Sequence, residues 1–558
     1  MDETPLDASA LDGLEGVEEA LAAGPAAARS GAWSTRALAA AGLIVAAASL
    51  GSRVLGYVRL VVVARAVPWA DQGASLDAFT QAFKIPDFLF QLVAAGALAS
   101  ALVPVLAALF ATGEDRRAWR VVSTVTTLVL GALVALVLVA EAVAPALVSG
   151  VVAPGFTGPK LQLTIDLTRV MLLGPLFMAG GAIASAVLNA RGRFAAAAVA
   201  PLVYNLGIIG GAVFLVPVMG VEGLAVGVVV GAVGLLAVQV PGLASVGTRL
   251  APSLDIRDDA TSKALVLMVP RAVGLGAAQV ALLVITSLAT GLPDGSVYAF
   301  NAAFTLLQIP IGVLGVPLGT VLLPSLSRVA ASGEVDAFRR LLVRGLGMLA
   351  YVMLALSALG IPLAGDVTRV TYGLSGLHAD AMGWIATSLA VFMLGLTAHS
   401  MIAILARAFY AMQDTTTPLL AAVAAVVLNI VVGVLLVGPL GLAGLAASIA
   451  VGAWLEVAWL VVMLIRRTPG LRLGELWRVM ALTVVAAVPG VLVAVAAESA
   501  LGAYGAAPGG TLVSLGRLIA VTAAGGLAIL AASLVLRIEE PRRMLGIVLD
   551  LMRRRGRG

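Results

Sequence analysis

The sequence GSRVLGYVRLVVVARAVP at 51–68, followed by LDAFTQAFKIPDFLFQLVAAGALASALVP at 76–104, decides the fold. Both stretches are apolar enough to cross a membrane, yet they carry ionisable side chains along their length. A charge near the centre of a bilayer costs about 2.5–3.5 kcal/mol on insertion scales, so it normally faces a watery cavity or a partner. The ionisable side chains are Arg53, Arg59, Arg65, Asp77, Lys84 and Asp87. We therefore expect a polar interior that further helices enclose, as in a transporter.

Composition places the whole chain in a membrane. Its 558 residues are 61% hydrophobic and only 12% charged, whereas soluble domains have about 25% charged residues. The absence of cysteine excludes disulfides, thiol catalysis and cysteine metal sites. The net charge of +5 indicates no nucleic-acid partner, because Lys and Arg in a membrane protein report topology.

Apolar runs long enough for a spanning helix recur along most of the chain. The pattern predicts an all-α polytopic membrane protein with fourteen spans. They are expected near 37–67, 77–110, 121–149, 166–189, 196–217, 221–244, 265–291, 297–325, 341–364, 380–405, 418–437, 442–465, 477–497 and 512–536.

Basic residues gather on alternate connections between these spans. Examples are Arg116, Arg117 and Arg120, then Arg191 and Arg193, then Arg339, Arg340 and Arg344, whereas Lys160 and Arg369 are exceptions on the opposite side. Because Lys and Arg favour the cytoplasmic side, both termini are expected in the cytoplasm. Residues 1–35 are acidic and lack the basic start of a signal peptide, so they predict a disordered cytoplasmic tail.

An internal repeat divides the chain. ALVPVLAALFATGEDRRAWR at 101–120 matches VLLPSLSRVAASGEVDAFRR at 321–340, and GVEGLA at 220–225 matches GLAGLA at 441–446. Both copies fall at the same side of the membrane, which predicts two parallel six-helix lobes with a site between them. The expected parts are an N-lobe at 36–245, a C-lobe at 246–466, two appended spans at 467–536 and a basic cytoplasmic tail at 537–558.

Polar residues form a stripe on the second span. Asp77, Gln81, Lys84 and Gln91 are spaced at i, i+4, i+7 and i+14, which places them on one helix face. This face should meet protein or water, although Asp77 and Lys84 could instead snorkel to the interface. Pro86 and Pro310 occupy corresponding places in the two lobes and are expected to break their helices.

On the first span, Arg53 and Arg59 are the expected cavity residues, and Arg65 is expected to snorkel. Residues six apart turn by about 240° in a straight helix, so Gly51 and Gly56 are candidate hinges.

In the second lobe, Asn301, Thr305 and Gln308 form a similar stripe on the eighth span, and Arg271 lies within the seventh. Substrate contacts are expected from these residues. Arg271 could equally snorkel to lipid phosphate. The sequence has no phosphate-binding loop, metal-ligand cluster or catalytic triad, which disfavours an enzyme or an ATP-driven pump.

These stretches resemble the MurJ (MviN) family of lipid II flippases, in the MOP exporter superfamily. The resemblance covers about 37–540. It rests on SRVLGYVRLVVVARA and DAFTQAFKIPDFL in the first two spans, IPIGVLGVPLGTVLLPSLSR in the eighth and FYAMQDTTTP before the eleventh. It implies fourteen helices around a cationic cavity, with the last two forming a groove for an undecaprenyl tail.

The resemblance also implies a function in peptidoglycan and cell-wall biogenesis, and hence in cell shape. Lipid II would be moved from the cytoplasmic to the periplasmic leaflet by alternating access, with no cofactor and no ATP. An ion gradient or the membrane potential would drive it, and cell-wall synthesis proteins are possible partners. Arg53, Arg59, Asp77 and Lys84 match family positions for substrate handling.

The sequence departs from the family pattern where charge is expected. Phe90, Gln91 and Ala95 replace a basic pair and a Glu, Thr305 and Gln308 replace an arginine and an acid, and Gly433 stands where some members have a sodium-binding acid. Alternatives are therefore a flippase for another polyprenyl-linked oligosaccharide, an antiporter of the MATE type, or a non-transporting scaffold for cell-wall enzymes.

Overall fold

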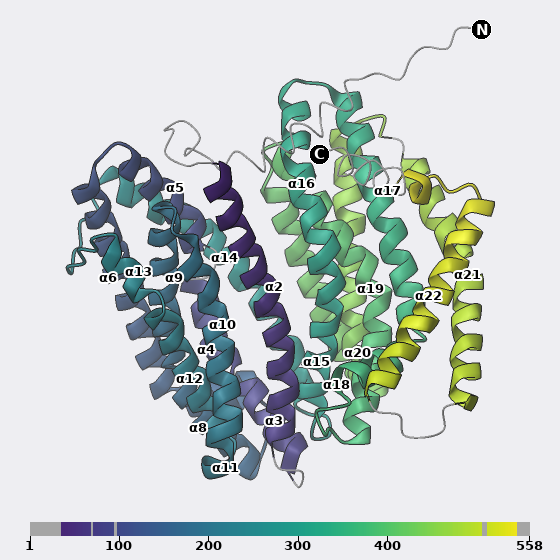
Figure 1. The fold of residues 1–558 in the computed structure, drawn as a ribbon, viewed down its shortest axis with the longest axis horizontal. Helices are drawn as coiled ribbons and strands as arrows, with labels where there is room; N and C mark the ends of the chain where they lie inside the picture. The colour runs from purple at the N-terminus through teal and green to yellow at the C-terminus, as the bar shows by residue number, and fades with distance from the viewer. Residues whose placement is uncertain (1–34, 68–70, 94–96, 472, 505–510, 544–558) are drawn as a thin grey trace. The chain divides into compact units, whose positions relative to one another are not determined.

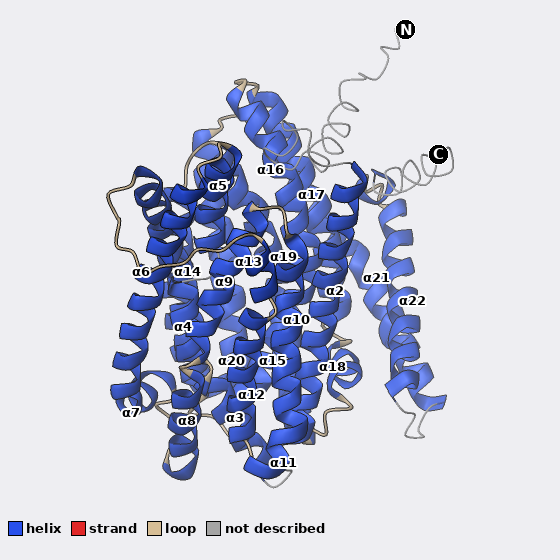
Figure 2. Cartoon of the chain, turned by 60° about the vertical axis from the view of Figure 1, so that its left-hand side comes forward, coloured by secondary structure: helices blue, strands red, loops and turns tan. Residues whose placement is uncertain are grey.

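The computed structural model describes residues 35–67, 71–93, 97–471, 473–504 and 511–543. In these ranges the chain is helical, and the segments between helices are loops and turns (Figure 2). Within the described residues, ten helices or continuous runs of helices are long and apolar enough to cross a membrane. The expected all-α polytopic membrane fold is confirmed. Of the expected tails at 1–35 and 537–558, residues 1–34 and 544–558 lie outside the described residues.

The chain forms two compact units, which we call unit 1 (Met1–Gly291) and unit 2 (Leu292–Gly558). The helices of unit 1 follow in chain order (Figure 1): α2 (Thr35–Ala66), α3 (Gln72–Ala82), α4 (Lys84–Val93), α5 (Ala97–Ala111), α6 (Asp115–Ala142), α7 (Ala144–Leu147), the π-helix η3 (Val148–Val152), α8 (Gly158–Met171), α9 (Gly174–Ala190), α10 (Phe194–Gly210), the π-helix η4 (Gly211–Leu215), α11 (Val216–Met219), α12 (Glu222–Ala237), α13 (Val240–Ser245) and α14 (Asp259–Ala289).

Unit 2 continues with the second set of helices. They are α15 (Ser296–Pro310), the π-helix η5 (Ile311–Gly315), α16 (Val316–Ala331), α17 (Val335–Gly360), α18 (Ala364–Tyr372), α19 (Ala379–Ala411), α20 (Thr416–Arg467), α21 (Leu473–Tyr504) and α22 (Thr511–Val535). Each expected span corresponds to one of these helices or to a short run of them, except that the eleventh and twelfth are two parts of α20. The long helix α20 breaks at Gly441, between the two spans expected at 418–437 and 442–465.

The division into units places α14 with the first set of helices, whereas the repeat assigns its span to the C-lobe. The physical reason is a set of contacts inside unit 1. The Gln81 side-chain amide on α3 donates to the Thr286 carbonyl of α14 at 3.1 Å, and the Gly155 N–H donates to the Thr290 hydroxyl at 3.0 Å. Helix α14 also packs against α4 and α5. The lobe boundaries drawn from the repeat stay a prediction.

Small residues allow the close helix packing on which membrane proteins depend. Gly207 and Gly211 of α10 and η4 lie against Gly227 and Gly231 of α12. A Cβ on Gly207 would lie 2.2 Å from the Gly231 Cα, so a side chain there would force the two backbones apart. Without a hydrophobic force between helices in lipid, such backbone approach supplies much of the packing attraction.

The two copies of the first repeat fold into the same corner. Gly113 (φ +77°) and Gly333 (φ +75°) both adopt the left-handed conformation that favours glycine. The next residue's N–H returns to a helix carbonyl in each: Glu114 to Leu109 at 2.9 Å and Glu334 to Val329 at 3.2 Å. This is the glycine-terminated helix end that orphan carbonyls require.

The second repeated motif shares its backbone too. Gly220 has φ 69° and ψ −150°, and Gly441 has φ 55° and ψ −132°. This region is essentially confined to glycine, because a Cβ would clash there. The sequence match between 220–225 and 441–446 therefore records a shared chain reversal.

In unit 2 the last two helices pack on α17 and α18. Leu359 and Leu363 form a buried cluster with Ala487, Val521 and Ile529 of α21 and α22. The Tyr351 hydroxyl of α17 lies 3.2 Å from that of Ser533 on α22. The helix pair that the sequence analysis describes as an appendage is thus joined to unit 2 by an apolar core and a buried hydrogen bond.

Candidate functional site

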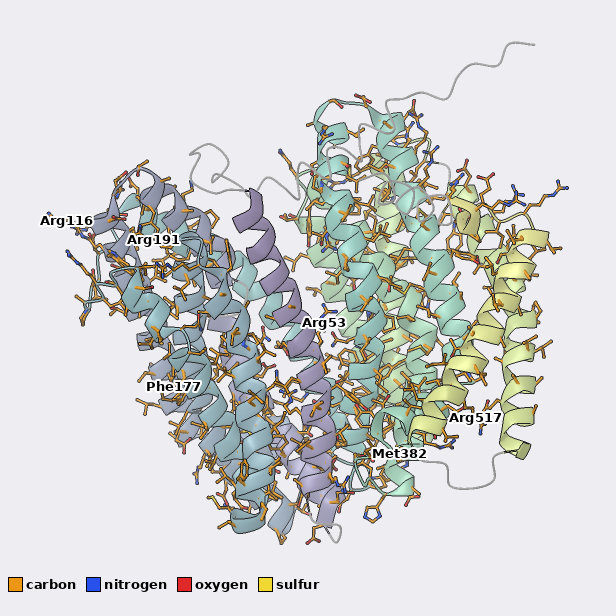
Figure 3. All side chains as sticks on the ribbon, viewed as in Figure 1. Arg53, Arg116, Phe177, Arg191, Met382 and Arg517 are labelled. Carbon is orange, nitrogen blue, oxygen red and sulfur yellow. The ribbon has the colours of Figure 1, made fainter. Side chains whose placement is uncertain are left out.

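Helix α2 carries Arg53, Arg59 and Arg65. It runs uninterrupted from Thr35 to Ala66, so neither Gly51 nor Gly56 breaks it in this structure, and a hinge at either stays a prediction. Arg53, labelled in Figure 3, is exposed within the described residues, whereas Arg59 is half-buried. Helix α2 packs against α10, and Arg59 lies within electrostatic range of Tyr204 there.

The second expected span, 77–110, contains α3, α4 and α5, and Phe83 separates α3 from α4. Pro86 falls in the first turn of α4, where its missing N–H costs no helical hydrogen bond. On α4, Asp87 is hydrogen-bonded to the Gln91 side chain and lies in electrostatic range of Lys84. Phe83 keeps a right-handed helical backbone, and the boundary at this residue places Lys84 and Asp87 in the first turn of α4.

Together these side chains form a group that we call the charge cluster: Arg59, Lys84, Asp87 and Tyr204. The charges of Asp87 on α4 and Arg59 on α2 both act on the Tyr204 hydroxyl of α10. Side chains from these three helices therefore lie within electrostatic range of one another. The Tyr204 hydroxyl is buried and has no hydrogen-bond partner among the described residues. Two cations and one anion leave the cluster with a net positive charge, which suits an anionic ligand. Unlike the other three, Tyr204 has no sequence signal beyond its place in an apolar span.

Asp77 lies in a different environment. Its carboxylate is 1% exposed and lies 2.9 Å from the ammonium of Lys160, on α8. Lys160 also lies over the Phe156 ring, 3.9 Å from its centroid. The neighbouring stripe residue Gln81 donates to the Val152 carbonyl at 2.7 Å. Asp77 and Gln81 thus have protein partners, as the stripe allows, and Lys160 is the partner that sequence reasoning missed.

In unit 2 the expected stripe on α15 begins with two internal hydrogen bonds. The Asn301 side-chain amide donates to the Val297 carbonyl at 2.9 Å, and the Thr305 hydroxyl donates to the Asn301 carbonyl at 2.8 Å. Thr305 and Gln308 are exposed within the described residues. Directly after Pro310 the helix widens into the π-helix η5, so the backbone changes its hydrogen-bond pattern at this proline.

Two further positions bear on the expected contacts. Arg271 lies on α14, but its side chain lies outside the described residues. Asn429, four residues before Gly433, accepts a hydrogen bond from the Ser448 hydroxyl at 2.7 Å. Among the described residues no three His, Cys, Asp or Glu side chains gather where a metal ion could bind.

This fold, with two helical units, repeated corners and a cationic cluster among spanning helices, is that of a polytopic membrane transporter. A solved structure described as "Lipid II flippase MurJ, inward closed conformation" shares it with a TM-score of 0.70, 19% identity, and coverage of 88% of this chain and 98% of that one. An inward-facing MATE transporter of the MOP superfamily has a TM-score of 0.59 and 16% identity, covering 74% of this chain and 93% of that one.

Sequence comparisons are more specific. The family model "Lipid II flippase MurJ" matches residues 72–508. The lipid II flippase MurJ of Burkholderia cenocepacia is 35% identical over 74% of this chain and 81% of its own length. A probable lipid II flippase MurJ of Rhizobium tropici is 32% identical, over 76% and 80%. The chain belongs to the MurJ family, which is a family of transporters and not of enzymes.

Proposed function

We propose that this protein moves lipid II across the membrane, from the cytoplasmic to the periplasmic leaflet, by alternating access. The observation that carries the proposal is membership of the MurJ family combined with the net positive charge cluster in unit 1. Lipid II carries a pyrophosphate, and guanidinium and ammonium groups bind phosphate oxygens through charge-assisted hydrogen bonds. Such bonds contribute about 1.5–3 kcal/mol each where they form away from bulk water.

Arg59 and Lys84 are the proposed pyrophosphate contacts. Asp87 lies beside Lys84 and would hold its ammonium in place until the substrate competes for it. Arg53, about 1.7 turns before Arg59 on the same helix, would meet the head group where α2 is exposed. Asn301, Thr305 and Gln308 would contribute neutral contacts from unit 2.

Arg271 is proposed to supply the positive charge that Thr305 does not. If it does so, Arg271→Ala should slow flipping, Arg271→Lys should rescue poorly, and Thr305→Arg should restore part of the activity to Arg271→Ala. An arginine that only contacts lipid phosphate should accept lysine without loss. Wild-type flipping by Arg271→Ala would refute this assignment.

The fold similarity to MATE transporters favours a cation antiporter as the second candidate. Such a protein needs an excess of acidic groups to bind a cationic substrate. The charge cluster has the opposite balance, and we therefore place the lipid-linked anion first.

The test is depletion of the protein in its own host, followed by measurement of lipid II in each leaflet of the inner membrane. We expect lipid II to accumulate on the cytoplasmic side and to clear when the wild-type gene is restored. An unchanged distribution between the leaflets would contradict the proposal. Accumulation of a different polyprenyl-linked oligosaccharide would identify that molecule as the substrate.

A further inference from the structure

A second basic site lies in unit 1 where α6 begins. A cavity of about 580 Å³ opens between the start of α6, the end of α9 and the segment after α13. Its lining includes four arginines and one acid, and Figure 3 shows two of the arginines, Arg116 and Arg191, at the same end of the unit. We call it the corner pocket, and its charged residues are Asp115, Arg116, Arg120, Arg191 and Arg249.

The positive charge of the corner pocket is only partly neutralised. Arg191 is paired with Asp115 at 2.8 Å, and Arg120 lies 3.7 Å from the exposed carboxylate of Asp255. Within the described residues, neither Arg116 nor Arg249 has an ion pair. The Nε of Arg191 is buried and has no acceptor there. A pocket with these groups is complementary to an anionic partner that brings several carboxylates.

The chain itself contains such a partner. The residues before α2 carry seven acids and a single arginine, Arg29. The acids are Asp2, Glu3, Asp7, Asp12, Glu15, Glu18 and Glu19. The last four of these seven acids lie in the run DGLEGVEE at 12–19, in which four of eight residues are acidic.

The connection to α2 brings this run within reach of the corner pocket. The chain crosses unit 1 once in α2 and returns through α3, α4 and α5, so α2 begins at the end of the unit where α6 begins (Figure 1). An interval of sixteen residues, from Glu19 to Thr35, can span on the order of 50 Å when extended. That is several helix diameters of about 10 Å, which is enough to cross the end of the unit.

We propose that the corner pocket binds the acidic run 12–19 of the same chain. Its glutamates and Asp12 would form charge-assisted hydrogen bonds with Arg116 and Arg249, whose guanidinium groups suit carboxylates. The site differs from the charge cluster, and its occupation does not depend on which substrate the protein carries.

The absence of native cysteine allows a direct test on the full chain. The substitutions Val17→Cys and Ala251→Cys would place one thiol inside the acidic run and one on the exposed lining of the pocket. In zwitterionic phosphatidylcholine nanodiscs, a short bifunctional maleimide should join them, as read by mass spectrometry after proteolysis. Changing Glu15, Glu18 and Glu19 to Gln should lower the yield about fivefold or more. Raising the salt to 1 M should do the same, because the Debye length falls from about 10 Å to about 3 Å.

A matched control comes from the corresponding corner of unit 2, where a cavity of about 500 Å³ is lined by Arg340 and Arg344 among other charged residues. Arg116→Ala with Arg249→Ala should reduce the crosslink as strongly as the Gln changes. Arg340→Ala with Arg344→Ala removes the same charge and should leave the yield unchanged. The proposal would be overturned if both double variants lost the crosslink equally. It would also be overturned if neither the Gln substitutions nor 1 M salt changed the crosslink yield.

An anionic lipid head group is the competing occupant. In nanodiscs containing phosphatidylglycerol, the crosslink should persist if the acidic run fills the pocket. If phosphatidylglycerol abolishes it, and Arg116→Ala with Arg249→Ala weakens binding of that lipid instead, the pocket is a lipid site and the proposal fails. Because crosslinking measures no transport, neither result depends on whether lipid II is flipped.

Discussion

The ammonium of Lys160 lies 2.9 Å from the carboxylate of Asp77, which is 1% exposed, and it joins α8 to α3 inside unit 1. Two charges taken out of water are costly, and each is tolerated because the other is present. The Phe156 ring covers the ammonium and adds a cation–π contact. Asp77 therefore has a structural partner, whatever its contact with substrate.

Removing either member of this pair should destabilise the protein strongly. Asp77→Asn or Lys160→Ala leaves one buried charge uncompensated, and we expect a loss of about 3–5 kcal/mol in unfolding free energy. The double variant should be less destabilised than the sum of the two, as measured by denaturation in detergent. Glu141→Gln is the control, because its pair with Arg169 is 3.6 Å long and exposed, and such pairs contribute about 0–1 kcal/mol. Additive losses at Asp77 and Lys160 would show that the pair is not coupled.

Arg59 should be required for flipping and dispensable for insertion. Arg59→Ala removes a proposed pyrophosphate contact, and a loss of about 1.5–3 kcal/mol in binding corresponds to roughly a tenfold to hundredfold lower rate at limiting substrate. Arg53→Ala should act in the same direction. Arg59→Lys should recover part of the rate, since it keeps the charge and loses the two-pronged geometry.

The control for Arg59 is Arg65→Ala, at the last turn of the same helix, where the side chain is exposed within the described residues. Its flipping rate should match the wild type. A lipid II flipping assay in vesicles, corrected for the amount of inserted protein, measures all four variants. Normal flipping by both Arg53→Ala and Arg59→Ala would remove the arginines from the proposed mechanism.

The arginine-rich ends of the helices predict topology. Reporter fusions after Ala111, Arg340 and Arg467 should give a cytoplasmic signal, because Lys and Arg are retained on that side. Fusions near Pro293 and Ser499 should report the periplasm. The repeated corners at Gly113 and Gly333 need the same side of the membrane in a parallel repeat, so a periplasmic signal at Arg340 would contradict that arrangement.

The repeated corners can be predicted from the sequence, whereas the partner of Asp77 and the π-helix after Pro310 cannot. Glycine is the only residue that readily adopts the positive-φ backbone conformation of Gly220 and Gly441. The repeated sequence motif therefore reveals both corners. The partner of Asp77 is 83 residues away, and no local pattern encodes a contact over that distance. Likewise, Pro310 predicts an interrupted helix. That the interruption takes the form of a π-helix depends on the packing around it.

Asp258 should make the fold sensitive to acid. It caps α14 by accepting from the N–H groups of Ala260 and Thr261, and Arg117 donates to it at 2.7 Å. Burial alone would raise the pKa of Asp258, but these hydrogen bonds outweigh it and hold the pKa below its ordinary value. Because the folded state then binds the proton less readily than the unfolded chain, the stabilisation is present above about pH 4 and is lost as the pH falls through the lowered value.

Asp258→Ala should therefore cost about 0.5–2 kcal/mol at pH 7, the usual effect of losing a helix cap, and less near pH 3. Thermal unfolding in detergent at the two pH values measures the difference. Asp255→Asn is the control, because that carboxylate is exposed and its arginine lies 3.7 Å away. An Asp258→Ala effect that is equal at both pH values would show that the carboxylate's charge contributes nothing.

Gln413 offers a prediction from the repeat itself. It has φ 62°, a left-handed conformation, in the corner between α19 and α20, where the corresponding corner between α9 and α10 has Gly192 at φ 72°. The left-handed conformation costs a residue with a Cβ about 1–2 kcal/mol, whereas glycine loses about 0.5–1 kcal/mol more chain entropy on folding. Gln413→Gly should therefore stabilise the protein by up to about 1 kcal/mol.

The reverse change tests the same cause at a matched site. Gly192→Gln should destabilise by about as much as Gln413→Gly stabilises, and Gly333→Gln should do so as well, since Gly333 also has a left-handed φ of 75°. Denaturation midpoints of the three variants in one detergent provide the comparison. If Gln413→Gly lowers stability, the Gln413 side chain must contribute more to its corner than the strained backbone costs, and the two corners then differ in how they are held.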